Sequence, residues 1–256
     1  MEEEWKMKQL TEKLVTKKLA RLRVSTLIVL SFMAIGLAMP SGTQNAQPTA
    51  SDSLAGLTVA IDPGHGGYDG GARARESGVW EKEVTLQIAQ QVEQTLAERG
   101  AAVLLTRTQD VCLSEDGSGK ARKRADLQAR LDLAQEAGAD VFLSIHLNEY
   151  RDRTESGPQV FYQHGADAGR LLAGAMQEAL IRELKPARVR QANAGDYYVL
   201  RNTALPAALV ECGFLSNAEE EKLLLDETYQ RRIAQAVAGG LENWMELRAR
   251  TGENGL

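Results

Sequence analysis

Three residues that can bind a metal ion or move a proton stand at the ends of apolar runs that lie far apart in the chain. His65 follows TVAID through a Pro-Gly turn, His146 follows VFLSI, and Glu211 follows AALV. Such runs are typical of buried strands, and the carboxyl ends of parallel strands meet at one edge of a sheet, where ligands bind. The sequence contains three histidines, and two of them are expected at this edge. We therefore predict a shared site there.

A fourth candidate comes from the helical periodicity of WEKEVTLQIAQQVEQTL. The apolar residues of this stretch fall on one stripe: Val84, Ile88, Val92 and Leu96. At 100° per residue Glu81 lies within about 20° of the centre of the stripe, whereas Glu83 lies about 140° away, with the polar residues. A carboxylate that faces a core is costly unless it is paired or bound to a cation. Two other interpretations of Glu81 stay open, a first-turn charge favoured by the helix dipole and a partner of a buried arginine.

Two imidazoles and one carboxylate form a common ligand set of catalytic zinc, with the fourth position open to water. We therefore expect His65, Glu81 and His146 to hold Zn²⁺, which lowers the pKa of bound water towards 7. Their spacings, 16 and then 65 residues, match no helical HExxH motif. Burial at a strand end should raise the pKa of Glu211, which suits a group that takes a proton from water and returns it to a leaving amine. The alternative for Glu211 is a structural carboxylate that caps the following loop.

Other polar residues near the predicted strand ends are weaker candidates. Asn148, two residues after His146, can orient a ligand or a substrate amide. Arg107 follows the strand-like run LLT. Its side chain has two interpretations: it binds a substrate carboxylate, or it binds the end of a helix of the protein itself. His164 lies in the polar loop YQHGADAG and is expected to be exposed to solvent.

The elements that must position these residues alternate along the chain. Strands are expected at residues 57–62, 102–106, 141–146, 159–162, 197–200 and 207–211. Helices are expected at residues 80–99, 121–137, 166–183 and 228–248. Strands interleaved with long helices indicate an α/β fold. We predict a single three-layer domain with a mostly parallel, mixed central sheet flanked by helices.

The first 55 residues differ from the rest in composition. Residues 1–23 are charged, residues 24–39 (VSTLIVLSFMAIGLAM) carry no charge, and residues 40–55 form a polar spacer. The apolar run is just shorter than the ~17–25 residues of a full membrane span, and basic residues precede it. This order predicts a cytoplasmic segment, a signal or membrane anchor, a linker, a catalytic domain over residues 56–248 and a tail over residues 249–256. A cleaved signal and a buried core helix are the alternatives for residues 24–39.

Charge and cysteine content exclude some functions. A net charge of -5 argues against a nucleic-acid binder, because phosphate contacts need clustered lysine and arginine. Cys112 and Cys212 form no CxxC motif and no metal cluster. We expect two ordinary thiols, although outside the cytoplasm a disulfide between them is an alternative.

Four segments, IDPGHGGYDGGA, WEKEVTLQIA, VFLSIHLN and LVECGFLSN, resemble the zinc-dependent N-acetylmuramoyl-L-alanine amidases with a type 3 domain. They occur in the order in which that family has them. The resemblance implies that His65, Glu81 and His146 are the zinc ligands and that Glu211 is the catalytic glutamate. It further implies hydrolysis of the bond between N-acetylmuramic acid and L-alanine in peptidoglycan, outside the cytoplasm.

Within that family, the chain is similar to the spore-cortex, germination-specific members. This similarity implies that the reaction is a step toward muramic-δ-lactam and that the protein lies in the intermembrane space of the developing spore. It also allows for an activating protein partner. The family often has an arginine followed five residues later by asparagine, but Arg130 is followed by Gln135, so we place this pair outside the site. Cys212 stands where a small apolar residue is usual. No autoinhibitory helix is expected between His146 and Glu211.

Two other functions compete with the amidase interpretation. A zinc peptidase or deacetylase would use the same ligands on another amide, because a metal-ligand set does not name its substrate. A non-catalytic wall-binding protein would keep the fold without the chemistry. The presence of all four residues, His65, Glu81, His146 and Glu211, favours an enzyme over the binding protein.

Overall fold

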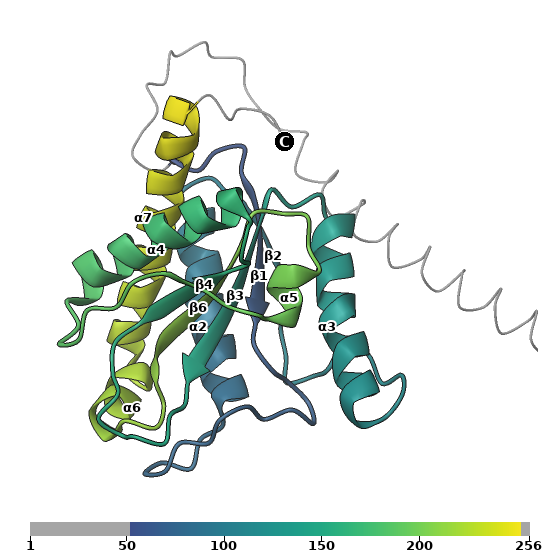
Figure 1. Cartoon of the computed structure of the whole chain (residues 1–256), viewed down its shortest axis with the longest axis vertical. Coiled ribbons are helices and arrows are strands. Elements are labelled where there is room, and N and C mark those ends of the chain that lie inside the picture. Colours follow the sequence, from purple (N-terminus) through teal and green to yellow (C-terminus); the bar gives the residue numbers. More distant parts are fainter. Residues whose placement is uncertain (1–51, 252–256) are drawn as a thin grey trace, which may run out of the picture. The chain divides into compact units, whose positions relative to one another are not determined.

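The computed structural model describes residues 52–251, which belong to one compact unit, Pro48–Leu256. The strands are β1 (Thr58–Pro63), β2 (Ala102–Leu105), β3 (Val141–Asn148), β4 (Gln159–Tyr162), β5 (Asn193–Ala194) and β6 (Ala207–Phe214). The helices are α2 (Glu81–Ala97), α3 (Gly119–Glu136), α4 (Asp167–Leu184), α5 (Tyr198–Arg201), α6 (Ala218–Leu224) and α7 (Glu227–Thr251). Strands and helices therefore alternate over most of the domain (Figure 1).

The strands form one six-stranded sheet in the order β2-β1-β3-β6-β4-β5. Every neighbouring pair is parallel except β4 and β6, which are antiparallel. The register places His146 of β3 directly beside Glu211 of β6, and a bulge follows between His146 and Asn148. The predicted mixed, mostly parallel sheet is thus confirmed, and its central strands carry two of the candidate site residues.

Helices cover both faces of the sheet, as the continuous apolar runs of its central strands require. On one face α2, α4 and α7 pack together, and their apolar residues join those of the sheet in one core, which includes Ile88, Met176 and Val237. On the other face α3 and α5 bury a smaller cluster that includes Leu131 and Phe142. Figure 1 shows α3 and α5 apart from α2, α4 and α7, so the domain has three layers.

One predicted element was wrong. Residues 197–200 were expected to form a strand because the stretch YYVL is aromatic and β-branched. They instead lie in and beside α5, whose Val199 and Leu200 are buried against the smaller core. Packing of these two side chains against α3 and the sheet is compatible with a single helical turn, so tertiary burial outweighs the strand-like composition. The short helix α6 was not predicted either.

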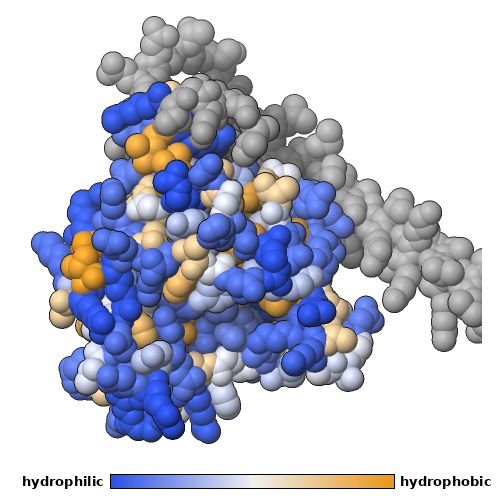
Figure 2. All heavy atoms as spheres, viewed as in Figure 1, coloured by the Kyte–Doolittle hydropathy of each residue, from blue (hydrophilic) through white to orange (hydrophobic). Residues whose placement is uncertain are grey.

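The surface seen in Figure 2 is mostly hydrophilic, and its apolar residues are scattered rather than gathered in one patch.

Cys112 is half-buried and Cys212 is buried, and both are free thiols, as expected. The proposed signal or anchor at residues 24–39 lies outside the described residues. Within residues 52–251, none of the helices has the length and apolar character needed to cross a membrane.

Candidate active site

The turn after β1 brings His65 beside His146, which lies near the end of β3. His65 has a backbone φ of 63°, in the left-handed region that non-glycine residues rarely adopt. A side chain at Gly64 would place its Cβ 2.4 Å from the His146 ring, so glycine is needed where β1 and β3 approach each other. The His65 and His146 rings consequently meet edge-on, with centroids 4.9 Å apart.

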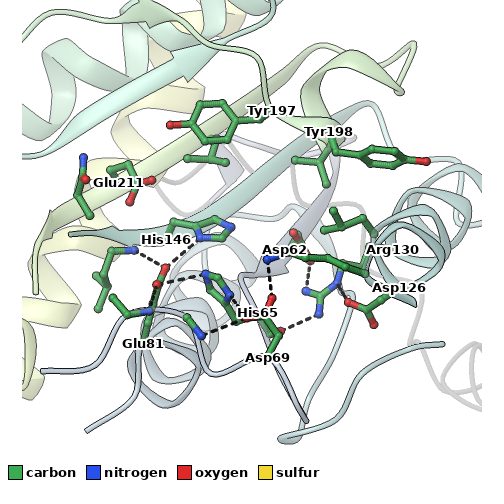
Figure 3. A pocket seen from close by; sticks show the side chains of 18 of the residues that line it. Asp62, His65, Asp69, Glu81, Asp126, Arg130, His146, Tyr197, Tyr198 and Glu211 are labelled. Atoms are coloured by element: carbon green, nitrogen blue, oxygen red, sulfur yellow. Dashed lines mark hydrogen bonds and ion pairs between the residues drawn. The ribbon is translucent and has the colours of Figure 1, made fainter. Parts of the chain in front are cut away.

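Glu81, at the start of α2, lies between the two imidazoles (Figure 3). Its Oε2 is 3.1 Å from His65 Nε2, and its Oε1 is 3.0 Å from His146 Nδ1. The backbone N–H groups of Ala72 and Leu147 also donate to Oε2 and Oε1, at 2.9 and 3.0 Å. The side chain points inward, as the helical phase predicted, whereas Glu83 is exposed.

The electrostatics of the group favour a cation. Burial alone would raise the pKa of Glu81, but hydrogen bonds with His146 and His65 outweigh it and hold that pKa below its ordinary value. Burial alone would lower the pKa of His65, but hydrogen bonds with Asp69 and Glu81 raise it to about 9. Carboxylate charge at this site therefore stabilises positive charge on or beside His65.

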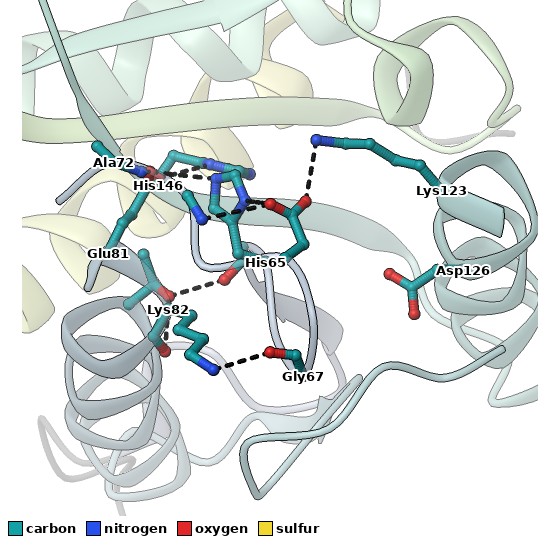
Figure 4. Close-up of polar contacts among 12 residues, drawn as sticks. His65, Gly67, Ala72, Glu81, Lys82, Lys123, Asp126 and His146 are labelled. Atoms are coloured by element: carbon teal, nitrogen blue, oxygen red, sulfur yellow. Dashed lines mark hydrogen bonds and ion pairs between the residues drawn. The ribbon is translucent and has the colours of Figure 1, made fainter. Parts of the chain in front are cut away.

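A zinc ion fits the residues present. The available ligand atoms of His65, Glu81 and His146 all lie within 4.8 Å of one another, and imidazole nitrogen with carboxylate oxygen is a set that zinc prefers. Asp69 adds the outer contact that usually orients a metal-binding histidine, with its Oδ1 3.0 Å from His65 Nδ1. Lys123 reaches from α3 to Asp69 Oδ2 at 2.9 Å (Figure 4). Asp69 was missed in the sequence, where its only signal was its place in GGYDGG.

Changing Glu81 and Glu83 separately to glutamine tests this arrangement. Glu81→Gln removes the charge between the imidazoles, and we expect zinc to bind ~10–100-fold more weakly or worse, because changes to outer contacts alone cost that much. Glu83→Gln should leave zinc affinity unchanged, because the Glu83 side chain faces solvent. Competition with a chromophoric chelator measures both affinities. Equal losses in the two variants would contradict the assignment of Glu81.

Glu211 faces the same cavity from β6 (Figure 3). The residue is 8% exposed, and its buried Oε2 has no hydrogen-bond partner among the described residues. Burial and the nearby charge of Glu81 raise the pKa of Glu211 to about 8. An unpaired carboxyl oxygen with a raised pKa is suited to accepting and returning a proton near neutral pH.

The cavity has a volume of about 570 Å³, and Asn148 lines it at the end of β3. Arg107 does not line it, which corrects the suggestion that this residue binds a substrate carboxylate. Its side chain is buried and donates to the backbone oxygens of Pro63, Gly64, Lys82 and Gln109. Arg107 therefore supports the turn that carries His65.

Arg130 requires the opposite correction. We placed it outside the site because Gln135 interrupts the family pattern, and Gln135 is indeed exposed. Arg130, however, is buried in the cavity wall, where it pairs with Asp62 and Asp126. The third histidine, His164, is exposed, as expected.

Within this α/β domain, His65, Glu81 and His146 could hold a metal ion and Glu211 lines the same cavity, an arrangement that could support metal-assisted hydrolysis. The model of the N-acetylmuramoyl-L-alanine amidase family matches residues 59–243, and the chain belongs to this family. Its members hydrolyse an amide bond of the bacterial cell wall, so the chain is an enzyme of this class.

Relatives of known structure or function agree with this membership. The germination-specific N-acetylmuramoyl-L-alanine amidase of Bacillus subtilis is 37% identical over 190 residues, which cover 73% of this chain and 79% of the relative. The CwlD amidase of Clostridioides difficile, solved in complex with the GerS lipoprotein, is 33% identical with a TM-score of 0.71, over 75% of this chain and 99% of that one. The catalytic domain of CwlV from Bacillus (Paenibacillus) polymyxa var. colistinus is 33% identical with a TM-score of 0.65, over 74% and 98%.

Proposed function

We propose that the chain hydrolyses the amide bond between the lactyl group of N-acetylmuramic acid and the L-alanine of peptidoglycan stem peptides, as a step toward muramic-δ-lactam in spore cortex. The observation that carries the proposal is the placement of Glu211. Glu211 lines the cavity shared with His65, Glu81 and His146, and its buried Oε2 has no hydrogen-bond partner among the described residues. The similarity to a germination-specific amidase supports the cortex as the substrate.

Each site residue has a distinct task in this reaction. Zinc, when held by His65 Nε2, Glu81 and His146, supplies Lewis acidity and lowers the pKa of water. The Asp69 carboxylate, 3.0 Å from His65 Nδ1, favours a proton on that nitrogen, which leaves the lone pair of Nε2 for the ligand position. The Glu211 carboxylate takes a proton from the attacking water and delivers it to the L-alanine nitrogen as the amide bond breaks. Asn148, on the cavity wall, orients the substrate amide.

Mass spectrometry of cortex peptidoglycan digested by the full chain tests this function. We expect free stem peptides that begin with L-alanine and glycan strands that carry unsubstituted muramic acid. Peptides cut internally would indicate a peptidase, and loss of acetyl groups without peptide release would indicate a deacetylase. Binding without any cleavage would indicate a wall-binding protein. The Glu211→Gln chain serves as the control for contaminating hydrolases.

The relationship to cell-wall amidases implies an extracytoplasmic location for the chain. We propose that residues 24–39 direct export, as a signal or as an anchor, with residues 1–23 in the cytoplasm, 40–55 as linker, 56–248 as catalytic domain and 249–256 as tail. The C. difficile relative was solved with a lipoprotein, and an extracytoplasmic activating protein of that kind is our proposal for this chain too.

A reporter fused after residue 50 tests the topology. Alkaline phosphatase should be active there and β-galactosidase inactive, because basic residues before an apolar run keep the preceding segment in the cytoplasm. Cell fractionation then separates an anchor, which leaves the fusion in the membrane, from a cleaved signal. The reverse pattern of reporter activity would contradict export by residues 24–39.

A further inference from the structure

Two buried arginines hold three consecutive backbone carbonyls of the turn that presents His65. Arg107, just after β2, donates from Nε to the oxygen of Pro63 and from Nη2 to that of Gly64, both at 2.9 Å. Arg130, on α3, donates from Nη1 to the same oxygen of Pro63 at 2.9 Å and from Nη2 to the oxygen of His65 at 2.6 Å. Their side chains are only 2% and 1% exposed. The turn is thus held from both sides.

These contacts fix the backbone of His65 in particular. The carbonyl of Gly64 belongs to the peptide plane before the His65 Cα, and the carbonyl of His65 belongs to the plane after it. With Arg107 on the first and Arg130 on the second, both backbone dihedrals of His65 are held. The residue needs this support, because its φ of 63° is unfavourable for a side chain with a Cβ.

Arg130 is itself held in place by buried carboxylates. Arg130 forms ion pairs with Asp62 at 2.8 Å and with Asp126 at 3.0 Å. Asp62, in turn, accepts hydrogen bonds from Thr106 and Ser144, at 2.6 and 2.7 Å. Burying charged groups is expensive even when they are paired, and an apolar set of similar volume often serves stability as well or better. The presence of two guanidinium groups at this turn is therefore not well explained by fold stability alone.

We propose that Arg107 and Arg130 are positioning residues, which set the direction of the His65 side chain so that its Nε2 faces Glu81. This inference rests on the proposed metal-dependent function. A planar guanidinium can donate to two acceptors at fixed angles, whereas an ammonium on a flexible stem acts as a point charge. Lysine at either position keeps the positive charge but cannot hold two carbonyls of the turn in the same geometry.

The test compares Arg107→Lys and Arg130→Lys in the full chain with the parent. Zinc affinity is measured by chelator competition, thermal unfolding is followed in parallel, and the Co²⁺-substituted proteins are compared by visible absorption. We expect zinc to bind ~10–100-fold more weakly in each lysine variant, the usual effect of losing an outer contact to a ligand. The Co²⁺ spectrum should change as well, because a displaced His65 alters the ligand geometry.

Leu131→Ala is the matched control. Leu131 follows Arg130 on α3 and is 5% exposed, but it packs in the smaller core rather than on the turn. Its truncation should lower the unfolding temperature, because the void left in the core destabilises the fold. The zinc affinity of the folded protein should stay within about twofold of the parent. Loss of stability and loss of ligand geometry are thereby separated.

Several results would overturn the inference. Parental zinc affinity in both lysine variants, or an equal loss of affinity in Leu131→Ala, would show that the arginines do not position His65. Failure of both lysine variants to fold would show that they act on the whole domain instead. A parent chain that binds no zinc would overturn the proposed function and this inference together, whereas a zinc-binding parent with unaffected variants would overturn this inference alone.

Discussion

Glutamine at position 211 is expected to lower the rate of amide hydrolysis by ~10²–10⁴ and to leave zinc content and folding unchanged. The carboxyl group of Glu211 is buried, its Oε2 lacks a partner among residues 52–251, and its pKa is raised to about 8. Glu81, His65 and His146 would together supply three ligands, and catalytic zinc needs no fourth from the protein. Glu211→Gln keeps the shape of the side chain and removes the proton acceptor.

The rate is measured by release of L-alanine-terminated peptides, together with zinc content and a thermal unfolding curve. Glu149→Gln is the matched control, since Glu149 lines the same cavity but is exposed, and its rate should stay close to that of the parent. Hydrolysis by Glu211→Gln within a few-fold of the parent, with zinc bound, would remove Glu211 from the mechanism. Loss of zinc would make it a ligand instead.

Alanine at position 65 or 146 is expected to abolish stoichiometric zinc binding and, with it, hydrolysis. Each change deletes an imidazole that lies about 3 Å from the shared carboxylate of Glu81. Two ligands then remain where a catalytic zinc site needs three. The chain should still fold, because the two imidazoles lie at the cavity edge rather than in the apolar core.

The sequence supplies its own control for this experiment. His164→Ala removes the third histidine, which is exposed in the loop before α4, and it should retain full zinc content and activity. Metal analysis of the dialysed proteins gives the comparison directly. Full occupancy in His65→Ala or His146→Ala, or loss of zinc in His164→Ala, would refute the ligand assignment.

The residues that could be predicted from the sequence are those whose position follows from one element alone. His65, His146 and Glu211 are placed by the ends of single apolar runs, and Glu81 is placed by the phase of one helix. The four long helices and all strands except the two-residue β5 were found for the same reason, with ends shifted by a few residues. These inferences need only local periodicity and the rule that parallel strands end at one edge.

The remaining features depend on contacts between segments that no local pattern connects. Asp69 reaches His65 only because the loop folds back on itself, and Arg130 reaches it only because α3 packs beside the end of β1. The sequence could not show whether Arg107 binds a substrate or a part of the protein. The structure shows that its side chain donates to backbone oxygens of the turn. The YYVL stretch had strand-like composition, but its apolar residues are buried in the smaller core as part of α5, and tertiary context decided its conformation.

The position of β6 in the sheet makes assembly of the candidate site depend on the last strand of the described residues. It is the last strand in the described part of the chain, yet it lies inside the sheet, between β3 and β4. Until β6 pairs with β3 and β4, Glu211 has no fixed place beside His65, Glu81 and His146. Pairings between strands so distant in sequence form slowly. We therefore expect the candidate proton-transfer group to join the three candidate metal ligands only when the last strand completes the sheet, so that a partly folded domain has no activity.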